Sequence, residues 1–227
     1  MALSVWELAR ISELVYSTDN KKSFGGGLVK RNEFSTKSFY AAVFEKKGDI
    51  VLAFRGTDQP LDYLTGNITN FLAGVSLQSI DAIHAYRKAW QATAKTERQN
   101  FYITGHSLGG ALTTIVTLIA DDDVRGVTFC APGVGVVVLA AGLPGTIIRM
   151  VASHIIANNL VNICVRGDVV SHIPGLTGKK IWVNAEYKDK HSIKELGKNI
   201  KKSKEMNVDV EKVIKEQDKI KKSIDKS

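Results

Sequence analysis

Ser107 is the residue best placed for nucleophilic chemistry. It lies at the centre of the sequence G-H-S-L-G-G (residues 105–110), which joins the strand-like stretch NFYIT to the helix-like stretch ALTTIVTLIA. A tight strand-to-helix turn exposes the serine hydroxyl, and the helix dipole points its positive end to where charge develops during acyl transfer. Glycines two positions before and after the serine remove side chains that would clash across the turn. The pattern predicts a serine nucleophile.

A serine hydroxyl reacts slowly near neutral pH, so the chemistry needs a histidine base and an acid that orients it. In folds with this turn, the acid and then the histidine follow the serine along the chain. Asp168 follows the strand-like stretch LVNICVRG, and His191 lies in the loop after the strand-like stretch KKIWVN. Asp168 and His191 are therefore the expected partners of the serine.

Other residues compete for these two roles. His172 is the rival base, but it lies only four residues after Asp168 and is interpreted instead as a wall of the substrate site. His106, next to the serine, has the same interpretation. Asp189 and Glu186 are alternative acids, and they are less favoured because they belong to the loop that carries the histidine.

The elements that must position these residues alternate between strand and helix. Residues 38–55 predict a hairpin with its turn at residues 46–49, and a helix with Asp81 as its N-cap is expected next. Strands are expected near residues 124–132, 160–167 and 179–184. This order predicts an α/β fold whose sheet is largely parallel in its second half.

Several motifs resemble the class 3 lipase family, the fungal-type triacylglycerol lipases with their bacterial and plant relatives. The resemblance runs from about residue 38 to residue 191. It is carried in order by F-R-G-T (54–57), D-Y-L (62–64), I-H-A-Y (83–86), G-H-S-L-G-G (105–110), T-F-C-A-P-G-V-G (128–135), the spaced Asn162, Asp168, Val170 and Pro174, and a late histidine. Two departures are the Cys-Ala pair before Pro132, where the family usually has glycine, and the segment after Gly135.

The resemblance implies an α/β-hydrolase fold, with a central, mostly parallel sheet flanked by helices. It implies hydrolysis of lipid carboxylic esters, as in a triacylglycerol lipase or a phospholipase A1-like enzyme, without cofactor or metal. The backbone N–H groups of Thr57 and Leu108 are implied as the oxyanion hole. Leu108 is also expected from the turn itself, because it follows the nucleophile at the helix start. The hydrolase domain is expected over residues 1–193.

About half of the net charge of +8 lies in the C-terminal segment, where residues 194–226 hold eleven lysines against seven acids. Residues 194–227 are expected to form a lysine-rich helix or a disordered tail. No basic motif interleaved with aromatic residues is present, so a nucleic-acid partner is not expected. The charge favours an anionic membrane surface, which tilts the expected substrate slightly towards phospholipid.

The apolar segment of residues 134–160 has three interpretations: a pair of buried helices, an acyl-chain tunnel or interfacial lid, and a membrane hairpin. Residues 61–80 are a second candidate for a lid. An apolar rim beside the serine would favour long acyl chains in the substrate.

The N-terminal sixteen residues predict an amphipathic helix and not a cleavable signal peptide, which indicates cytoplasmic residence or export without such a signal. Cys130 and Cys164 are expected to be buried thiols. Two other classes of function stay open: a soluble carboxylesterase or thioesterase with the same triad, and a non-catalytic membrane-binding protein. The second would be supported if Asp168 or His191 were to lie far from Ser107.

Overall fold

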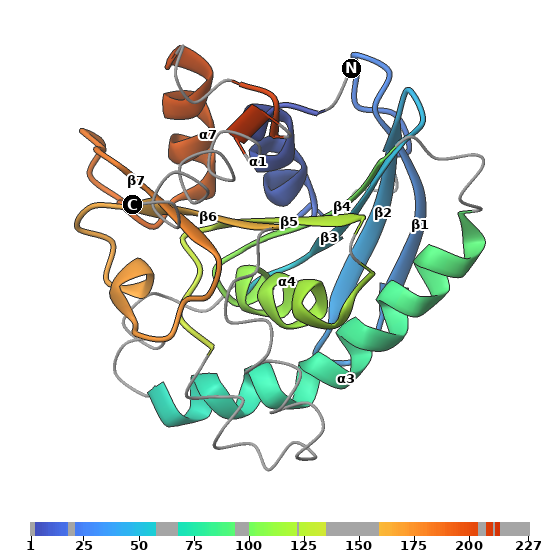
Figure 1. Ribbon diagram of the computed structural model, residues 1–227, viewed down its shortest axis with the longest axis horizontal. Coiled ribbons are helices and arrows are strands. Elements are labelled where there is room, and N and C mark those ends of the chain that lie inside the picture. Colours follow the sequence, from blue (N-terminus) through green and yellow to red (C-terminus); the bar gives the residue numbers. More distant parts are fainter. Residues whose placement is uncertain are drawn as a thin grey trace, which may run out of the picture.

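The computed structural model describes residues 3–17, 21–57, 68–93, 100–121, 123–134, 159–203, 208–210 and 212–213, with only the backbone of residues 68–74. Within these ranges seven strands form one sheet in chain order (Figure 1). They are β1 (Val29–Ser35), β2 (Tyr40–Lys46), β3 (Asp49–Phe54), β4 (Asn100–His106), β5 (Val124–Phe129), β6 (Leu160–Val165) and β7 (Lys179–Val183).

The strands β1 to β3 are antiparallel, and the strands β3 to β7 are parallel. Parallel strands bring their carboxyl ends to the same edge of the sheet, where ligands bind in open α/β folds. The expected hairpin is confirmed as β2 and β3, joined at Lys47 and Gly48, whose φ angles are +53° and +84°. Two successive positive φ angles are typical of the turns that connect tightly paired strands.

The helices cover both faces of the sheet. They are α1 (Val5–Leu14), α3 (Ile68–Ala92), α4 (Leu108–Ile119) and α7 (Ile193–Lys202), with the 3-10 helix η1 (Val170–His172) after β6. Figure 1 shows α1 and α7 on one face and α3 and α4 on the other. The mostly parallel sheet between two helical layers confirms the predicted α/β fold.

The core consists of two apolar layers, one on each side of the sheet. Leu8 of α1 and Leu196 of α7 belong to the layer that includes Tyr102 of β4. Leu112 of α4 belongs to the opposite layer, with Phe101 of β4. Neighbouring residues of β4 thus point to opposite layers, and both are buried because helices cover both faces. This rigid central strand carries Ser107 at its end.

The two terminal segments pack together. Ser4 caps α1 in a capping box, in which its side chain accepts from the Glu7 backbone N–H and the Glu7 carboxylate accepts from the Ser4 backbone. The lysine-rich segment begins as α7, whose Leu196 and Ile200 are buried while its lysines are exposed. Helices α1 and α7 are in contact, so α7 is part of the folded layer.

One expectation about the first half of the chain was wrong, and one strand there was not expected. Helix α3 begins at Ile68, thirteen residues before the expected N-cap, and the Asp81 carboxylate instead accepts a hydrogen bond from the Thr36 hydroxyl at 3.2 Å. Strand β1 was not expected, because its sequence VKRNEFS is polar and it forms the exposed edge of the sheet.

The proposed lid and apolar segment lie mostly outside the described residues, namely residues 61–67 and 135–158. Residues 68–80 belong to α3, where Val75 is buried while Leu77 and Ile80 are 74% and 58% exposed. None of the helices in the described ranges has the length and apolar character needed to cross a bilayer. Both cysteines are buried thiols, as expected.

Candidate active site

Ser107 lies in a strained turn between β4 and α4. Its φ and ψ angles are +56° and −124°, a conformation that costs a non-glycine residue on the order of 1–3 kcal/mol. The Ser107 backbone N–H donates to the Phe129 carbonyl of β5 at 3.0 Å, which fixes the turn against the neighbouring strand. The hydroxyl is thereby held at the carboxyl edge of the sheet.

The glycines around Ser107 are required by the close approach of backbone segments. A Cβ atom on Gly105 would lie 2.3 Å from the Gly109 carbonyl oxygen, and one on Gly109 would lie 2.2 Å from the Phe54 carbonyl oxygen. Both distances are far below van der Waals contact. The glycine spacing therefore allows α4 to start directly against β3 and β4.

Asp168 and His191 form a hydrogen-bonded pair at the same edge. The Nδ1 atom of His191 lies 2.9 Å from Oδ1 of Asp168, whose side chain is fully buried. The carboxylate also accepts the backbone N–H groups of Val170 at 3.2 Å and Ser171 at 3.0 Å, together with the Ser171 hydroxyl. Each acceptor site of the carboxylate is thus used to hold it in one orientation.

The charge of Asp168 is maintained despite its burial. Burial by itself raises the pKa of a carboxyl group, but the hydrogen bonds and charge of His191 and the hydrogen bonds of Ser171 outweigh it. The net effect is that the pKa of Asp168 is lowered. An ionised carboxylate on Nδ1 keeps the proton on that nitrogen and leaves the lone pair of the imidazole on Nε2.

The reactive atoms of Ser107 and His191 have no partner among the described residues. Ser107 Oγ and His191 Nε2 are both buried and make no hydrogen bond, either to each other or elsewhere in the described chain. A buried donor and a buried acceptor left unsatisfied are costly, and such groups gather at catalytic sites. In enzymes without substrate the bond between nucleophile and base is often long and tightens on binding.

The two expected oxyanion donors lie on neighbouring segments. Leu108 is the first residue of α4, where backbone N–H groups have no acceptor within the helix. Thr57 follows β3, which is paired in parallel with β4 so that Phe54 lies beside Gly105. Both residues therefore follow strand ends at the edge that carries Ser107.

The other expected site residues occupy distinct positions. His106 is 6% exposed, and its Nε2 lies 2.7 Å from the His191 carbonyl oxygen. His172 is exposed, bonds the Asp168 carbonyl through Nδ1 at 2.7 Å, and packs on Trp182 with ring centroids 4.8 Å apart. The structure thus brings His191, and not His172, to the Asp168 carboxylate.

The alternative acids do not replace Asp168 in this arrangement. Asp189 accepts the backbone N–H of His191 at 3.2 Å, and Glu186 is exposed. Sequence reasoning missed Ser171 and Tyr16, which support Asp168 and His106. The spacing D-x-x-S, in which a serine can bond back to the carboxylate, was a usable signal for Ser171. No local signal marks Tyr16.

One cluster has the composition of a metal site. His106, Cys130 and His191 place ligand atoms within 4.8 Å of one another. However, both ring nitrogens of His106 are hydrogen-bonded, and burial, followed by the charge of Asp168, raises the pKa of the Cys130 thiol. A metal prefers a thiolate and a free nitrogen lone pair, so this donor set does not fit one as arranged.

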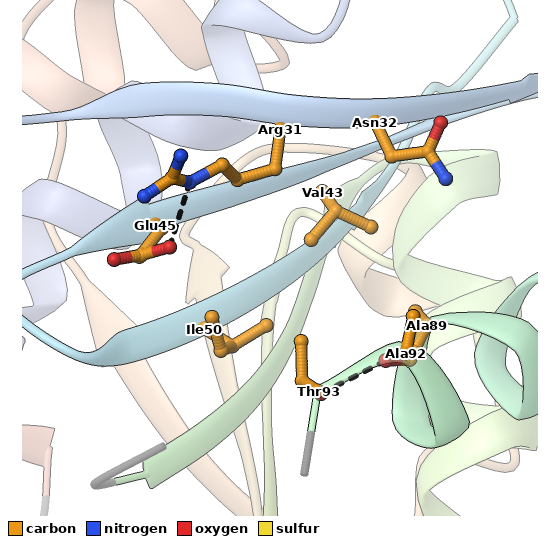
Figure 2. Close-up of a pocket in the computed structure, with 8 residues that line it drawn as sticks. All are labelled: Arg31, Asn32, Val43, Glu45, Ile50, Ala89, Ala92 and Thr93. Atoms are coloured by element: carbon orange, nitrogen blue, oxygen red, sulfur yellow. Dashed lines mark hydrogen bonds and ion pairs between the residues drawn. The ribbon is translucent and has the colours of Figure 1, made fainter. Parts of the chain in front are cut away.

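A separate cavity of about 540 Å³ is lined by residues of β1, β2 and β3 and of the C-terminal end of α3 (Figure 2). It is lined by aliphatic groups such as Ile50 and Ala89 and by the ion pair of Arg31 and Glu45, whose N–O distance is 2.7 Å. Ile50 lies at the start of β3, whereas Ser107 follows the end of β4. This cavity is therefore not part of the serine site.

The strained serine turn, the Asp–His pair and the sheet topology define the class as a lipase-like α/β-hydrolase. A sequence model of the Tle-like phospholipase domain matches residues 7–207, and the chain belongs to this phospholipase-like family. No curated protein matches the chain. The resemblance to lipases noted in the sequence is thereby confirmed at the level of a lipase-like α/β-hydrolase family.

Solved structures agree with the fold. The native propeptide complex of Rhizomucor miehei lipase is similar with a TM-score of 0.54 and 16% identity, covering 81% of this chain and 70% of that one. A deletion mutant of the same complex gives a TM-score of 0.53 and 14% identity, covering 81% of this chain and 69% of that one. At these identities the likeness concerns the fold. Family and fold together support hydrolysis of a lipid ester.

Proposed function

We propose that this protein hydrolyses an acyl ester of phospholipids with Ser107, His191 and Asp168 as a catalytic triad. The observation that carries the proposal is the 2.9 Å pair of Asp168 and His191, at the same sheet edge as a serine in a strained strand-to-helix turn. A buried ionised acid, a histidine with its outer nitrogen unpartnered and a positioned hydroxyl are the three groups that acyl transfer requires.

The reaction begins when Ser107 Oγ attacks the ester carbonyl while its proton passes to His191 Nε2. The negative oxygen of the tetrahedral intermediate accepts hydrogen bonds from the backbone N–H groups of Thr57 and Leu108. Collapse of the intermediate breaks the ester bond, and His191 returns the proton to the leaving alkoxide of the lysophospholipid. Asp168 stabilises the imidazolium throughout.

Water completes the cycle. It attacks the acyl-serine and gives its proton to His191, and collapse of the second intermediate releases the fatty acid and restores the Ser107 hydroxyl. Each step uses side chains and backbone groups of this chain alone.

The phospholipid substrate is supported by the family of the chain and by its surface. Exposed lysines at positions 194, 198, 201 and 202 give α7 a cationic side that suits an anionic lipid surface. Leu77 and Ile80, three positions apart on α3, are exposed apolar side chains that suit a lipid interface.

Fatty acid release tests the proposal directly. Wild type and Ser107→Ala are compared on vesicles of phosphatidylcholine and phosphatidylglycerol, on a triolein emulsion and on a short-chain p-nitrophenyl ester. We expect release from the vesicles by wild type that falls at least about 1,000-fold in the variant, since loss of the nucleophile removes the covalent route.

Different acyl chains at the two glycerol positions identify the ester that is cleaved. Hydrolysis of the short ester alone would overturn the phospholipid assignment in favour of a soluble carboxylesterase. Absence of hydrolysis with folded protein on all three substrates would overturn the enzyme proposal and favour a membrane-binding protein.

A further inference from the structure

We propose that His106 and Tyr16 are positioning residues for His191, connected in a hydrogen-bonded chain that runs from the end of α1 to the backbone of the histidine loop (residues 184–192). The inference deepens the proposed function and rests on the role of His191 as the base. It assigns a role to an N-terminal tyrosine, 90 residues from the serine motif.

The need for a second anchor follows from the chemistry of His191. Its Nδ1 is held by Asp168, and its Nε2 must stay unpartnered to receive the serine proton. The ring can therefore be hydrogen-bonded through only one atom, Nδ1. That single hydrogen bond positions one ring nitrogen but leaves the His191 backbone able to shift. An anchor that leaves the reacting nitrogen untouched has to act on the His191 backbone.

His106 supplies that anchor. Its Nε2 lies 2.7 Å from the His191 carbonyl oxygen, and the two rings lie with centroids 4.6 Å apart. The Cys130 thiol also approaches the next carbonyl of the loop, that of Lys190, but at 3.9 Å and as a weak donor. The bond from His106 is thus the stronger of these two contacts to backbone carbonyls of the loop.

Tyr16 fixes the tautomer of His106. A carbonyl oxygen can only accept, so Nε2 of His106 must carry the ring proton, and Nδ1 is then an acceptor. The Tyr16 hydroxyl lies 2.9 Å from that Nδ1 and donates to it. Without this donor, the opposite tautomer would become accessible, and Nε2 would then present a lone pair to the His191 carbonyl.

The site of the Tyr16 hydroxyl exists because residue 56 is glycine. A Cβ atom on Gly56 would lie 2.2 Å from the Tyr16 hydroxyl oxygen and 2.7 Å from the His106 carbonyl oxygen. The hydroxyl therefore occupies the space of a missing side chain, directly before Thr57. One part-buried contact thus joins the segment of the proposed oxyanion hole, the serine turn and, through His106, the histidine loop.

Burial keeps His106 in its neutral form. Burial in the first place, and the nearby His191 in the second, lower the pKa of His106 to about 3. The donor at Nε2 and the acceptor at Nδ1 therefore persist over the range in which ester hydrolysis by a neutral histidine operates. The two hydrogen bonds of His106 therefore persist while His191 gains and loses its proton.

A matched pair of substitutions tests the proposal. In His106→Gln the terminal amide N–H₂ reaches the position of Nε2 and can donate to the His191 carbonyl. In His106→Asn the shorter amide reaches only the position of Nδ1 and leaves that carbonyl without its donor. Tyr16→Phe removes the tautomer-fixing hydroxyl, and Tyr86→Phe, which removes a buried hydroxyl bonded to Asp121 at 3.1 Å, is the control.

Two readouts are measured with the whole chain: kcat and KM on a p-nitrophenyl ester, and amide hydrogen exchange of peptides covering residues 185–192. We expect His106→Asn to lower kcat by about 10- to 100-fold, as for a base misplaced by about an ångström, with KM within about twofold. His106→Gln should recover most of the loss, and Tyr16→Phe should fall between them. Amide hydrogen exchange in the loop should accelerate most in His106→Asn, less in Tyr16→Phe and least in His106→Gln.

Two outcomes would overturn the proposal: wild-type kcat and loop exchange in His106→Asn, or equal losses in the Gln and Asn variants. The second outcome, or a loss in Tyr86→Phe as large as that in Tyr16→Phe, would indicate a general packing effect. If wild type shows no Ser107-dependent hydrolysis, the proposed function fails. Loop exchange then still decides whether His106 holds the His191 backbone.

Discussion

His191 and Asp168 are bonded at 2.9 Å although 23 residues of chain separate them, and the contact joins the loop after β7 to the end of β6. Both loops leave the same edge of the parallel sheet, beside the turn that carries Ser107. The topology of the sheet therefore assembles the proposed triad, because parallel strands release their following loops at one edge.

Replacement of Asp168 tests the contribution of the acid. Asp168→Asn should keep the shape but remove the charge that fixes the His191 tautomer, and kcat should fall by about 1,000- to 10,000-fold, as in other Ser-His-Asp triads. Steady-state hydrolysis of a p-nitrophenyl ester measures kcat of the variant and of wild type. Asp189→Asn is the matched control and should change kcat by less than about threefold; an equal loss in both variants would refute the assignment of the acid.

Two glycine-to-alanine substitutions should have opposite effects on stability. Gly109→Ala places a Cβ 2.2 Å from the Phe54 carbonyl oxygen and should lower the free energy of unfolding by about 1–3 kcal/mol or prevent folding. Gly197→Ala, within α7, meets nothing within 4 Å and should raise it by about 0.5–1 kcal/mol. Urea denaturation measures both, and a destabilised Gly197→Ala would contradict the account of α7.

Cys130 provides a test of backbone strain. Its φ angle is +49°, in the left-handed region that favours glycine. Cys130→Gly should therefore be more stable to urea than Cys130→Ala by about 1 kcal/mol, although alanine is normally the more stabilising residue. Both variants lose the buried thiol, so the comparison isolates the backbone, and the reverse order would show that the strain is not real.

The pH dependence of stability should report on His106. Its pKa is about 3 in the folded protein and near 6.5 when unfolded, so below pH 6.5 the unfolded chain binds a proton that the folded chain does not. Stability should therefore fall as pH drops, by at most about 1.4 kcal/mol per pH unit from this group. His191 and Asp168 are the titratable groups whose electrostatic influence reaches it.

Asp168 affects the pH dependence of stability in a lower pH range. Its pKa is lowered by folding, so its contribution is present above the unfolded value, near 3.9, and is lost as pH falls through the folded value. Urea denaturation of wild type and His106→Gln between pH 6.5 and 4.5 thus separates the two groups. If the free energy of unfolding depended on pH equally in wild type and His106→Gln, the burial of a neutral His106 would be contradicted.

The elements that carry the proposed triad were predictable from the sequence, whereas parts of their surroundings were not. The strand before Ser107 and the helix after it are apolar runs joined by a glycine-rich turn, and Asp168 follows the buried apolar strand β6. His191 follows β7, which is partly buried and has the weaker pattern KKIWV. Such strong local patterns survive in the fold because burial on both faces of the sheet demands them.

The missed features depend on contacts between distant segments. Strand β1 is polar and becomes a strand by pairing with β2, and α3 begins at Ile68, upstream of Asp81, the residue expected to cap it. Tyr16 meets His106 only because α1 lies on the face of the sheet above β4. No spacing within the sequence could relate two residues that the fold alone brings together.

Labelling of the nucleophile tests the central claim most directly. A lipid-like fluorophosphonate reacts with a serine that is activated by a histidine, and peptide mass spectrometry locates the adduct. We predict one stoichiometric adduct on Ser107, formed at least about 100-fold more slowly in Asp168→Asn because the base is no longer oriented. An adduct at another residue, or phospholipid hydrolysis that continues after Ser107 is fully labelled, would contradict the account.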